Sequence, residues 1–220
     1  MRFINFPLML DSFWFVLSGL PYTLGISALS FLTGITGGLI LALMGRSKSA
    51  FLKALVTVYV STMRGVPMIV VLFMLYFGLP YFGLQLPALL CAYLGFSFVS
   101  SAYISEIFRS AIAAVDLGQW EAARALGLPY ATVVRHIILP QALRIAIPPL
   151  GNVVIDMIKS SSLAAMITVP DIFQNAKIVG GREWDYMSMY VLVAFIYWLL
   201  CFLVERAQGY IEKELSLTNS

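Results

Sequence analysis

Two opposite charges and several small polar residues lie within a segment that is otherwise apolar. Asp156 and Lys159 are three residues apart, and Asn152, Ser160 and Ser161 accompany them. A charged side chain at the centre of a bilayer costs about 2.5–3.5 kcal/mol on insertion scales, so each such residue needs a partner or a function. Asn152, Asp156, Lys159 and Ser160 share one face of a helix, because the last three follow Asn152 by 4, 7 and 8 positions. Ser161 is not on that face.

This polar stripe has two interpretations. In the first, Asp156 and Lys159 form an i, i+3 ion pair that neutralises itself, and Asn152 and the serines bond to neighbouring helices. In the second, the stripe faces a passage: an amino acid carries one carboxylate and one ammonium, so a cation and an anion together replace the water that both groups lose. The prolines and glycine of 148–151 are expected to break the helix just before the stripe and to expose backbone groups to a ligand.

Other polar residues lie in two further apolar segments. Arg64 begins an Arg-Gly-Val-Pro turn, and an ion pair with Glu106 is favoured for it over contact with a solute. Glu106 and Arg109 are three residues apart and are expected to form a structural pair or part of a gate. Tyr103 and nearby serines make their segment polar enough to line a passage, although small hydroxyls at helix contacts are also common.

The composition identifies the elements that must position these residues as membrane helices. The mean hydropathy is +0.89 and only 11% of the 220 residues are charged, against about 25% in soluble domains. The fold class expected is therefore an all-α integral membrane protein with five transmembrane helices, each long enough for a hydrocarbon core of about 30 Å. The expected spans cover residues 13–44, 54–80, 84–105, 145–169 and 186–204.

The basic residues predict the topology of these spans. The first apolar run is too long for the core of a signal peptide and is expected to be a retained anchor. Arg46, Lys48 and Lys53 follow it, which places that loop in the cytoplasm and the N-terminus outside. Alternation then puts about nine basic residues inside and three outside, the latter being Arg2, Lys177 and Arg182, with the C-terminus cytoplasmic. The net charge of +3 thus reports topology, and no nucleic-acid partner is implied.

Few residues could carry out catalysis or bind a metal. Cys91 and Cys201 lie in apolar spans without the close spacing of a metal or redox site, and His136 is the only histidine. No metal-ligand cluster, Ser/His/Asp arrangement or phosphate-binding glycine loop is present in the sequence. Without a Walker A pattern, the chain is not expected to hydrolyse ATP. Residues 1–220 are expected to form one transmembrane domain with a cytoplasmic insertion at about 110–145.

The insertion contains a short helix with clear ends. Asp116 and Gln119 are spaced as in a capping box, which predicts a helix start near Leu117. Gly127 suits a left-handed C-terminal cap. Pro129 is acceptable in the first turn of a second helix, which a further proline at position 140 is expected to end or kink.

A helix of about three turns is unstable alone in water and must dock on something. Internal packing on its own membrane domain is one possibility. The other is insertion into a groove of another protein, for which small alanines beside Trp120 and Glu121 are suited. Composition alone favours neither internal packing nor docking on another protein.

The same insertion carries a family resemblance. Glu121-Ala122-Ala123, three residues, Gly127, nine residues and Ile137-x-Leu139-Pro140 resemble the "EAA" signature of the permease subunits of bacterial ABC importers. Over about residues 15–215, the chain resembles the polar amino-acid uptake branch of that family. This branch serves solutes such as histidine, glutamine, arginine and cystine. The segments that carry this second resemblance are Arg64–Pro67, Phe73–Pro80, Ala102–Arg109, Gly118-Gln119 and Lys159–Leu163.

The resemblance implies a type I importer permease of the bacterial inner membrane. Its implied partners are ABC ATPase subunits, a second permease subunit and an extracytoplasmic amino-acid-binding protein, and ATP and Mg²⁺ would be bound by the ATPase, with no cofactor or metal in this chain. The residues expected to couple to the ATPase are Gln119, Trp120, Glu121, Ala122, Ala123 and Gly127. Those expected along the substrate passage are Tyr103, Asn152, Asp156, Lys159, Ser160 and Ser161, with Arg64, Glu106 and Arg109 structural or at the gate.

The sequence departs from the family at the polar stripe. The family often has Lys-Asp-Thr-Ser-Leu where this chain has Lys-Ser-Ser-Ser-Leu, so Ser160 replaces an acid, and Asp156 one turn earlier is a candidate to compensate. The resemblance therefore does not choose among basic, acidic and uncharged amino acids. The alternatives to a permease are an intramembrane enzyme that uses Asp156 and Lys159 as acid and base, and a passive channel or scaffold subunit.

Overall fold

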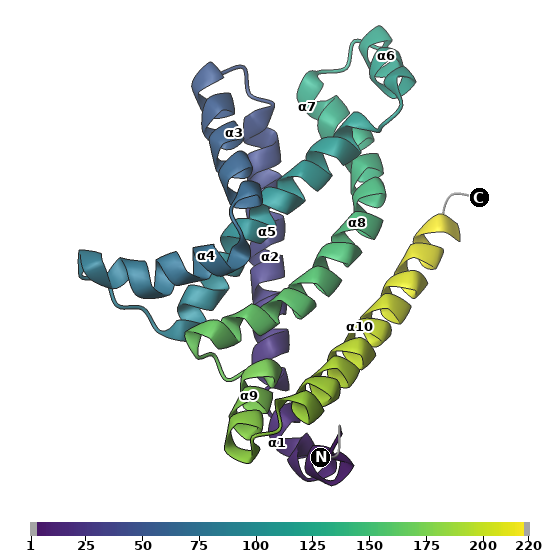
Figure 1. Ribbon diagram of the computed structural model, residues 1–220. Coiled ribbons are helices and arrows are strands. Elements are labelled where there is room, and N and C mark those ends of the chain that lie inside the picture. Colours follow the sequence, from purple (N-terminus) through teal and green to yellow (C-terminus); the bar gives the residue numbers. More distant parts are fainter. Residues whose placement is uncertain (1–3, 218–220) are drawn as a thin grey trace.

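The computed structural model describes residues 4–217, and every regular element within them is helical. Within this described part of the chain, four helices are long and apolar enough to cross a membrane, and a bent helix pair makes a fifth span, as predicted. Figure 1 shows α6 and the α2–α3 loop at one end of the molecule, and α1, α9 and the start of α10 at the other. The spans are α2 Leu20–Gly45, the bent pair Ala50–Gly65 and Met68–Phe82, α5 Ala88–Ala113, the run Tyr130–Ile167 and α10 Tyr186–Leu217.

The first span differs from the prediction of one continuous helix over 13–44. The chain forms a separate helix α1 (Phe6–Leu17) and then α2, with the break at Ser18 and Gly19. Gly19 lies so close to the backbone of Asp171 that a Cβ there would be 2.2 Å from the Asp171 carbonyl carbon. The break therefore lets the two backbones touch, a contact that apolar length alone does not reveal. Arg2, counted above as an outer charge, lies outside the described residues.

The second span bends sharply at the predicted Arg-Gly-Val-Pro turn. Helix α3 (Ala50–Gly65) and the following segment, composed of α4 (Met68–Phe73), the π-helical η1 (Met74–Gly78) and the 3₁₀ turn η2 (Leu79–Phe82), meet at 103°. Val66 is extended, with φ −87° and ψ 130°, because Pro67 disfavours the helical conformation in the residue before it. The bend places the end of α3 against α5, and its residues line a cleft together with α5 and α8.

Helix α5 forms the centre of the molecule and packs closely on α2 (Figure 1). Gly34 and Gly38 of α2 are four residues apart on the contact face, and a Cβ on Gly38 would lie 2.7 Å from the Ile104 side chain. The Ser100 hydroxyl donates to the carbonyl oxygen of Ser30 at 3.2 Å. Small residues and interhelical hydroxyl bonds are the usual means by which membrane helices approach each other, and here they fix α5 in place.

The fourth span is continuous, contrary to the prediction that prolines interrupt it. It runs through α7 (Tyr130–Val133), the π-helical η3 (Val134–Ile138), α8 (Leu139–Ser160) and the 3₁₀ turn η4 (Ser161–Ile167). Pro140 falls in the first turn of α8 after the π-helical turn, where a missing N–H is tolerated, so it does not end the helix. Pro148 and Pro149 lie inside α8, where Gln208 of α10 donates to the Pro148 carbonyl oxygen at 3.2 Å. Protein on that face allows the helix to continue.

Helix α9 (Ile172–Glu183) has no counterpart among the elements expected from the sequence. It links the fourth and fifth spans and packs with α1 and the start of α10. The cluster between them includes Val16, Ile172, Val179 and Met189, all at most 1% exposed. A short helix of low mean hydropathy between two long spans is hard to distinguish from a loop by its sequence.

Asp171 caps α9 from a fully buried position outside the spanning segments. Its Oδ1 accepts from the backbone N–H of Gln174 at 2.7 Å, whereas its Oδ2 has no hydrogen-bond partner among the described residues. Burial raises the pKa of this carboxyl to about 7, and the hydrogen bond from Gln174 opposes the rise. The protonated carboxyl is thus the form that the fold favours.

We expect Asp171→Asn to remove a pH dependence of stability. The folded pKa of about 7 exceeds the usual 3.8, so the contribution of this group to stability is full below pH 3.8 and is lost as pH rises through about 7. Asparagine keeps the helix cap without a charge. Thermal unfolding in detergent at pH 5 and pH 8.5 checks this: the variant should gain stability over the natural chain chiefly at pH 8.5. An equal difference at both pH values would contradict the assignment.

Candidate functional site

A cleft of about 580 Å³ opens between the α3–α4 bend, α5 and α8. The bend supplies Arg64 and the turn after it, α5 supplies Tyr103, and α8 supplies Asp156, Lys159 and Ser160. Three segments distant in sequence therefore meet at one site. The remaining lining residues are Met63, Gly65, Val66, Pro67, Met68, Phe96, Val99, Ser100, Val153 and Met157.

The cleft collects some but not all of the residues expected along the passage. Tyr103, Asp156, Lys159 and Ser160 line it, whereas Asn152 is exposed on α8 outside the lining and Ser161 is fully buried. The Ser161 hydroxyl donates to the carbonyl oxygen of Ile158 at 2.8 Å, within its own helical segment. Adjacent residues on a helix point about 100° apart, and at this position the turn directs Ser161 into the protein interior while Ser160 lines the cleft.

The charged groups of the cleft are of both signs and accessible. Lys159 Nζ lies 3.0 Å from Asp156 Oδ1, and the two side chains are 56% and 72% exposed. The guanidinium of Arg64 lies over the Tyr103 ring, 5.4 Å from its centroid. The predicted i, i+3 ion pair is thus present, but its accessible carboxylate and ammonium remain able to exchange partners with a charged solute.

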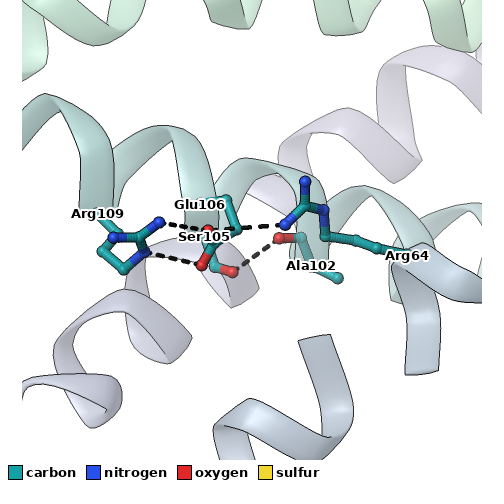
Figure 2. A network of polar contacts seen from close by, with 5 residues as sticks. All are labelled: Arg64, Ala102, Ser105, Glu106 and Arg109. Atoms are coloured by element: carbon teal, nitrogen blue, oxygen red, sulfur yellow. Dashed lines mark hydrogen bonds and ion pairs between the residues drawn. The ribbon is translucent and has the colours of Figure 1, made fainter. Parts of the chain in front are cut away.

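An ion-pair network beside the cleft joins α3 to α5. Figure 2 shows Glu106 between two arginines: Arg109 donates through Nε and Nη2 to the two carboxylate oxygens at 3.0 and 2.7 Å, and Arg64 Nη1 lies 3.6 Å from Oε2. The neighbouring Ser105 hydroxyl donates to the Ala102 carbonyl oxygen at 2.8 Å. The predicted pairing of Arg64 with Glu106 is confirmed. The network holds the end of α3 against α5 where the cleft begins.

Several cleft residues were not identified from the sequence, although a helical signal for them exists. Phe96 and Val99 precede Tyr103 by 7 and 4 residues, which is the spacing of one helix face, whereas Ser100 is one of the serines near Tyr103 that were expected to line a passage. On α8, Val153 precedes Asp156 and Met157 precedes Ser160 by three residues. These apolar wall residues can be predicted from the sequence by taking the positions three, four and seven residues away from the polar passage residues.

The helix of the insertion begins where its cap predicts. Helix α6 spans Leu117–Ala125, and Asp116 Oδ1 accepts from the backbone N–H of Gly118 at 2.7 Å. The reciprocal half of the capping box is absent, because the Gln119 side chain instead accepts a hydrogen bond from Gln141 Nε2 at 3.3 Å. Gly127 has φ +66°, and this left-handed conformation confirms the predicted C-terminal cap.

Helix α6 divides its residues between an inner and an outer face. Ala123 is 2% exposed, and the half-buried Trp120 stacks on Tyr130 with ring centroids 6.1 Å apart. These contacts hold α6 on its own membrane domain, so the Trp120 ring points inward and is not an exposed anchor. The coupling candidates that remain exposed are Gln119, Glu121, Ala122 and Gly127. They lie at the end of the molecule that α6 forms in Figure 1.

Comparison with known proteins identifies this architecture. Residues 34–217 match the family described as "Binding-protein-dependent transport system inner membrane component". The chain is 53% identical to a probable amino-acid ABC transporter permease protein, YckA, of Bacillus subtilis (strain 168), over 96% of this chain and 93% of that protein. It is 41% identical to the L-cystine transport system permease protein TcyB of the same organism, over 96% and 92% of the two chains.

Solved structures give the same result. An amino acid ABC transporter crystallised with histidines matches with a TM-score of 0.92 and 34% identity, over 96% of this chain and 99% of that one. The inward-facing MetNI methionine ABC transporter matches with a TM-score of 0.78 at 21% identity, over 93% and 98%, which supports the fold alone.

These findings decide between the alternatives that the sequence left open. The family is a permease component and not an enzyme, so the alternative of an intramembrane enzyme is not favoured, and ATP hydrolysis belongs to a partner subunit. The type I importer fold accounts for the five spans and the capped insertion. The chain belongs to the inner-membrane components of binding-protein-dependent transport systems, and it is the multi-pass permease subunit of an ABC importer.

Proposed function

We propose that this permease imports a polar amino acid, and that the cleft between α3, α5 and α8 contacts the solute. The observation that carries the proposal is the accessible Asp156–Lys159 pair in that cleft, which Arg64 of the α3–α4 bend also lines. A zwitterionic solute offers each charge a partner of opposite sign, which offsets the loss of water inside the membrane. The amino-acid names of the similar proteins support the same solute class.

The proposed assembly contains two permease subunits, identical or similar, with two clefts bordering one passage. An ABC ATPase docks on the exposed face of each α6, and binds the ATP and Mg²⁺. An extracytoplasmic binding protein delivers the solute to the opposite end. The position of α6 at one end of the spans and of α1 and α9 at the other supports this arrangement (Figure 1). The basic α2–α3 loop supports a cytoplasmic side at the α6 end, with the N-terminus outside.

Reconstitution tests the proposal directly. The chain, co-expressed with its ATPase and any second permease, is placed in proteoliposomes with the binding protein, and ATP hydrolysis is measured with each amino acid in turn. We expect hydrolysis and solute accumulation to rise together for at least one polar amino acid. ATP hydrolysis that does not respond to any amino acid would contradict the proposal that the solute is an amino acid. Solute flux in the absence of the ATPase would contradict the proposal that transport is coupled to ATP hydrolysis.

A further inference from the structure

A second cleft, of about 290 Å³, lies beneath the coupling helix where α2 ends. It shares no lining residue with the cleft between α3, α5 and α8, which is called the transport cleft below. Its walls come from the end of α2, the end of α5, α6 and the α7–η3 segment.

The polar part of this coupling-side cleft is cationic. Arg46 and Arg135 both line it, and within the described residues neither forms an ion pair with a carboxylate. Arg46 lies over the Trp120 ring, 5.9 Å from its centroid, which fixes its planar group at the cleft. The Ser47 hydroxyl adds a neutral donor. Two guanidinium groups and a hydroxyl form a donor set suited to phosphate oxygens.

The rest of the cleft is apolar and continues onto the outer surface of α2. Leu39, Ile112 and Ile138 form its inner wall, and Leu43 at its rim is 49% exposed. Ile40, on the adjoining surface of the same span, is 52% exposed. An apolar track therefore leads from the arginines along a membrane-spanning helix. Trp120 and Tyr130 beside the arginines are the aromatic residues that favour the membrane interface.

We propose that the coupling-side cleft binds an anionic phospholipid, with its phosphate between Arg46 and Arg135 and an acyl chain along Leu39 and Leu43. Basic pockets between membrane helices on the cytoplasmic side are typical sites for anionic lipid headgroups. A carboxylate of a partner protein or a free phosphate would match the arginines but would make no contact with the apolar track. A lipid matches both parts with one molecule.

The proposed site has a consequence for the coupling helix. Trp120 is part of the cleft wall and of the contact that holds α6 on the membrane domain. A lipid seated against Trp120 and Arg46 adds packing to that contact and stabilises the position of α6. This role is independent of which solute is carried and of the residues in the transport cleft.

Fluorescence quenching tests lipid binding on the full chain. The purified chain in detergent is titrated with phosphatidylglycerol brominated on its acyl chains, or with equally brominated phosphatidylcholine, and the signal of Trp120 is obtained by subtracting a Trp120→Phe variant. We expect stronger quenching by the anionic lipid. The preference should weaken about fivefold for each arginine removed in Arg46→Gln and Arg135→Gln. Equal quenching by the two lipids, or an unchanged preference in the double variant, overturns the proposal.

Three controls separate the alternatives. Arg135→Gln alone removes one charge without touching the Trp120 stack, so its effect does not depend on altered packing or intrinsic fluorescence. Lys53→Gln removes a charge from α3 at the same end of the molecule, outside the cleft, and should keep the preference. Loss of the preference in Lys53→Gln would reveal general charge attraction. Displacement of the lipid by millimolar inorganic phosphate would reveal a free-anion site, and either result overturns the proposal.

Discussion

We expect Gly127→Pro to lower ATP-driven uptake by at least about tenfold. Gly127 has φ +66°, whereas proline is fixed near −65°, and the Gly127 N–H that proline lacks donates to the Arg124 carbonyl oxygen at 2.9 Å. Strain of about 1–3 kcal/mol and a lost hydrogen bond worth about 1 kcal/mol together disfavour the native turn by about tenfold or more. The turn sets the direction of α6 relative to α7, so its change displaces the proposed ATPase contact.

The matched control is Gly127→Asn. A Cβ at this position would meet nothing within 4 Å, and asparagine tolerates the left-handed conformation, so uptake should stay within about twofold of the natural chain. Uptake in proteoliposomes and co-purification of the ATPase are measured for both variants. Normal uptake by the proline variant would show that the turn geometry does not matter for coupling.

Local signals made α6 predictable. Its start depends on Asp116 and its end on Gly127, and both act through bonds within a few residues of themselves. The bend at Val66 was predictable for the same reason, because Pro67 constrains its immediate neighbour. The pairing of Arg64 with Glu106 followed from the cost of a lone charge in an apolar segment. Features of this kind need no knowledge of distant contacts.

The features that were missed depend on other segments of the chain. The break at Gly19 exists because the Asp171 backbone occupies the space beside it, and nothing near Gly19 in the sequence indicates this. Pro148 was expected to break α8, but the helix continues next to Gln208 of α10. The residue types of α6 left internal packing and docking on another protein as equal alternatives for Trp120, whereas Tyr130 and Arg46 hold its ring inward. Tertiary packing decides each of these positions.

We expect Asp156→Asn to lower solute-stimulated hydrolysis and uptake by about tenfold or more, because a hydrogen bond to a charged group contributes about 1.5–3 kcal/mol. Stability should change little. The side chains of Asp156 and Lys159 are 72% and 56% exposed. Exposed ion pairs contribute only about 0.2–1 kcal/mol to the free energy of unfolding. Thermal unfolding in detergent, measured beside uptake, separates the loss of a solute contact from the loss of the fold.

Exchange of the two charges distinguishes a solute contact from a structural ion pair. The double variant Asp156→Lys with Lys159→Asp keeps an i, i+3 pair of opposite charges on the same face of α8, now in reverse order. If the pair only stabilises α8, the exchange should restore uptake to near the natural level. In the proposed transport cleft, Lys159 adjoins Ser160 and Asp156 lies one turn away, so the exchange moves the anion that faces the solute ammonium. Uptake should therefore stay at the level of Asp156→Asn, and full recovery would return Asp156 to a structural role.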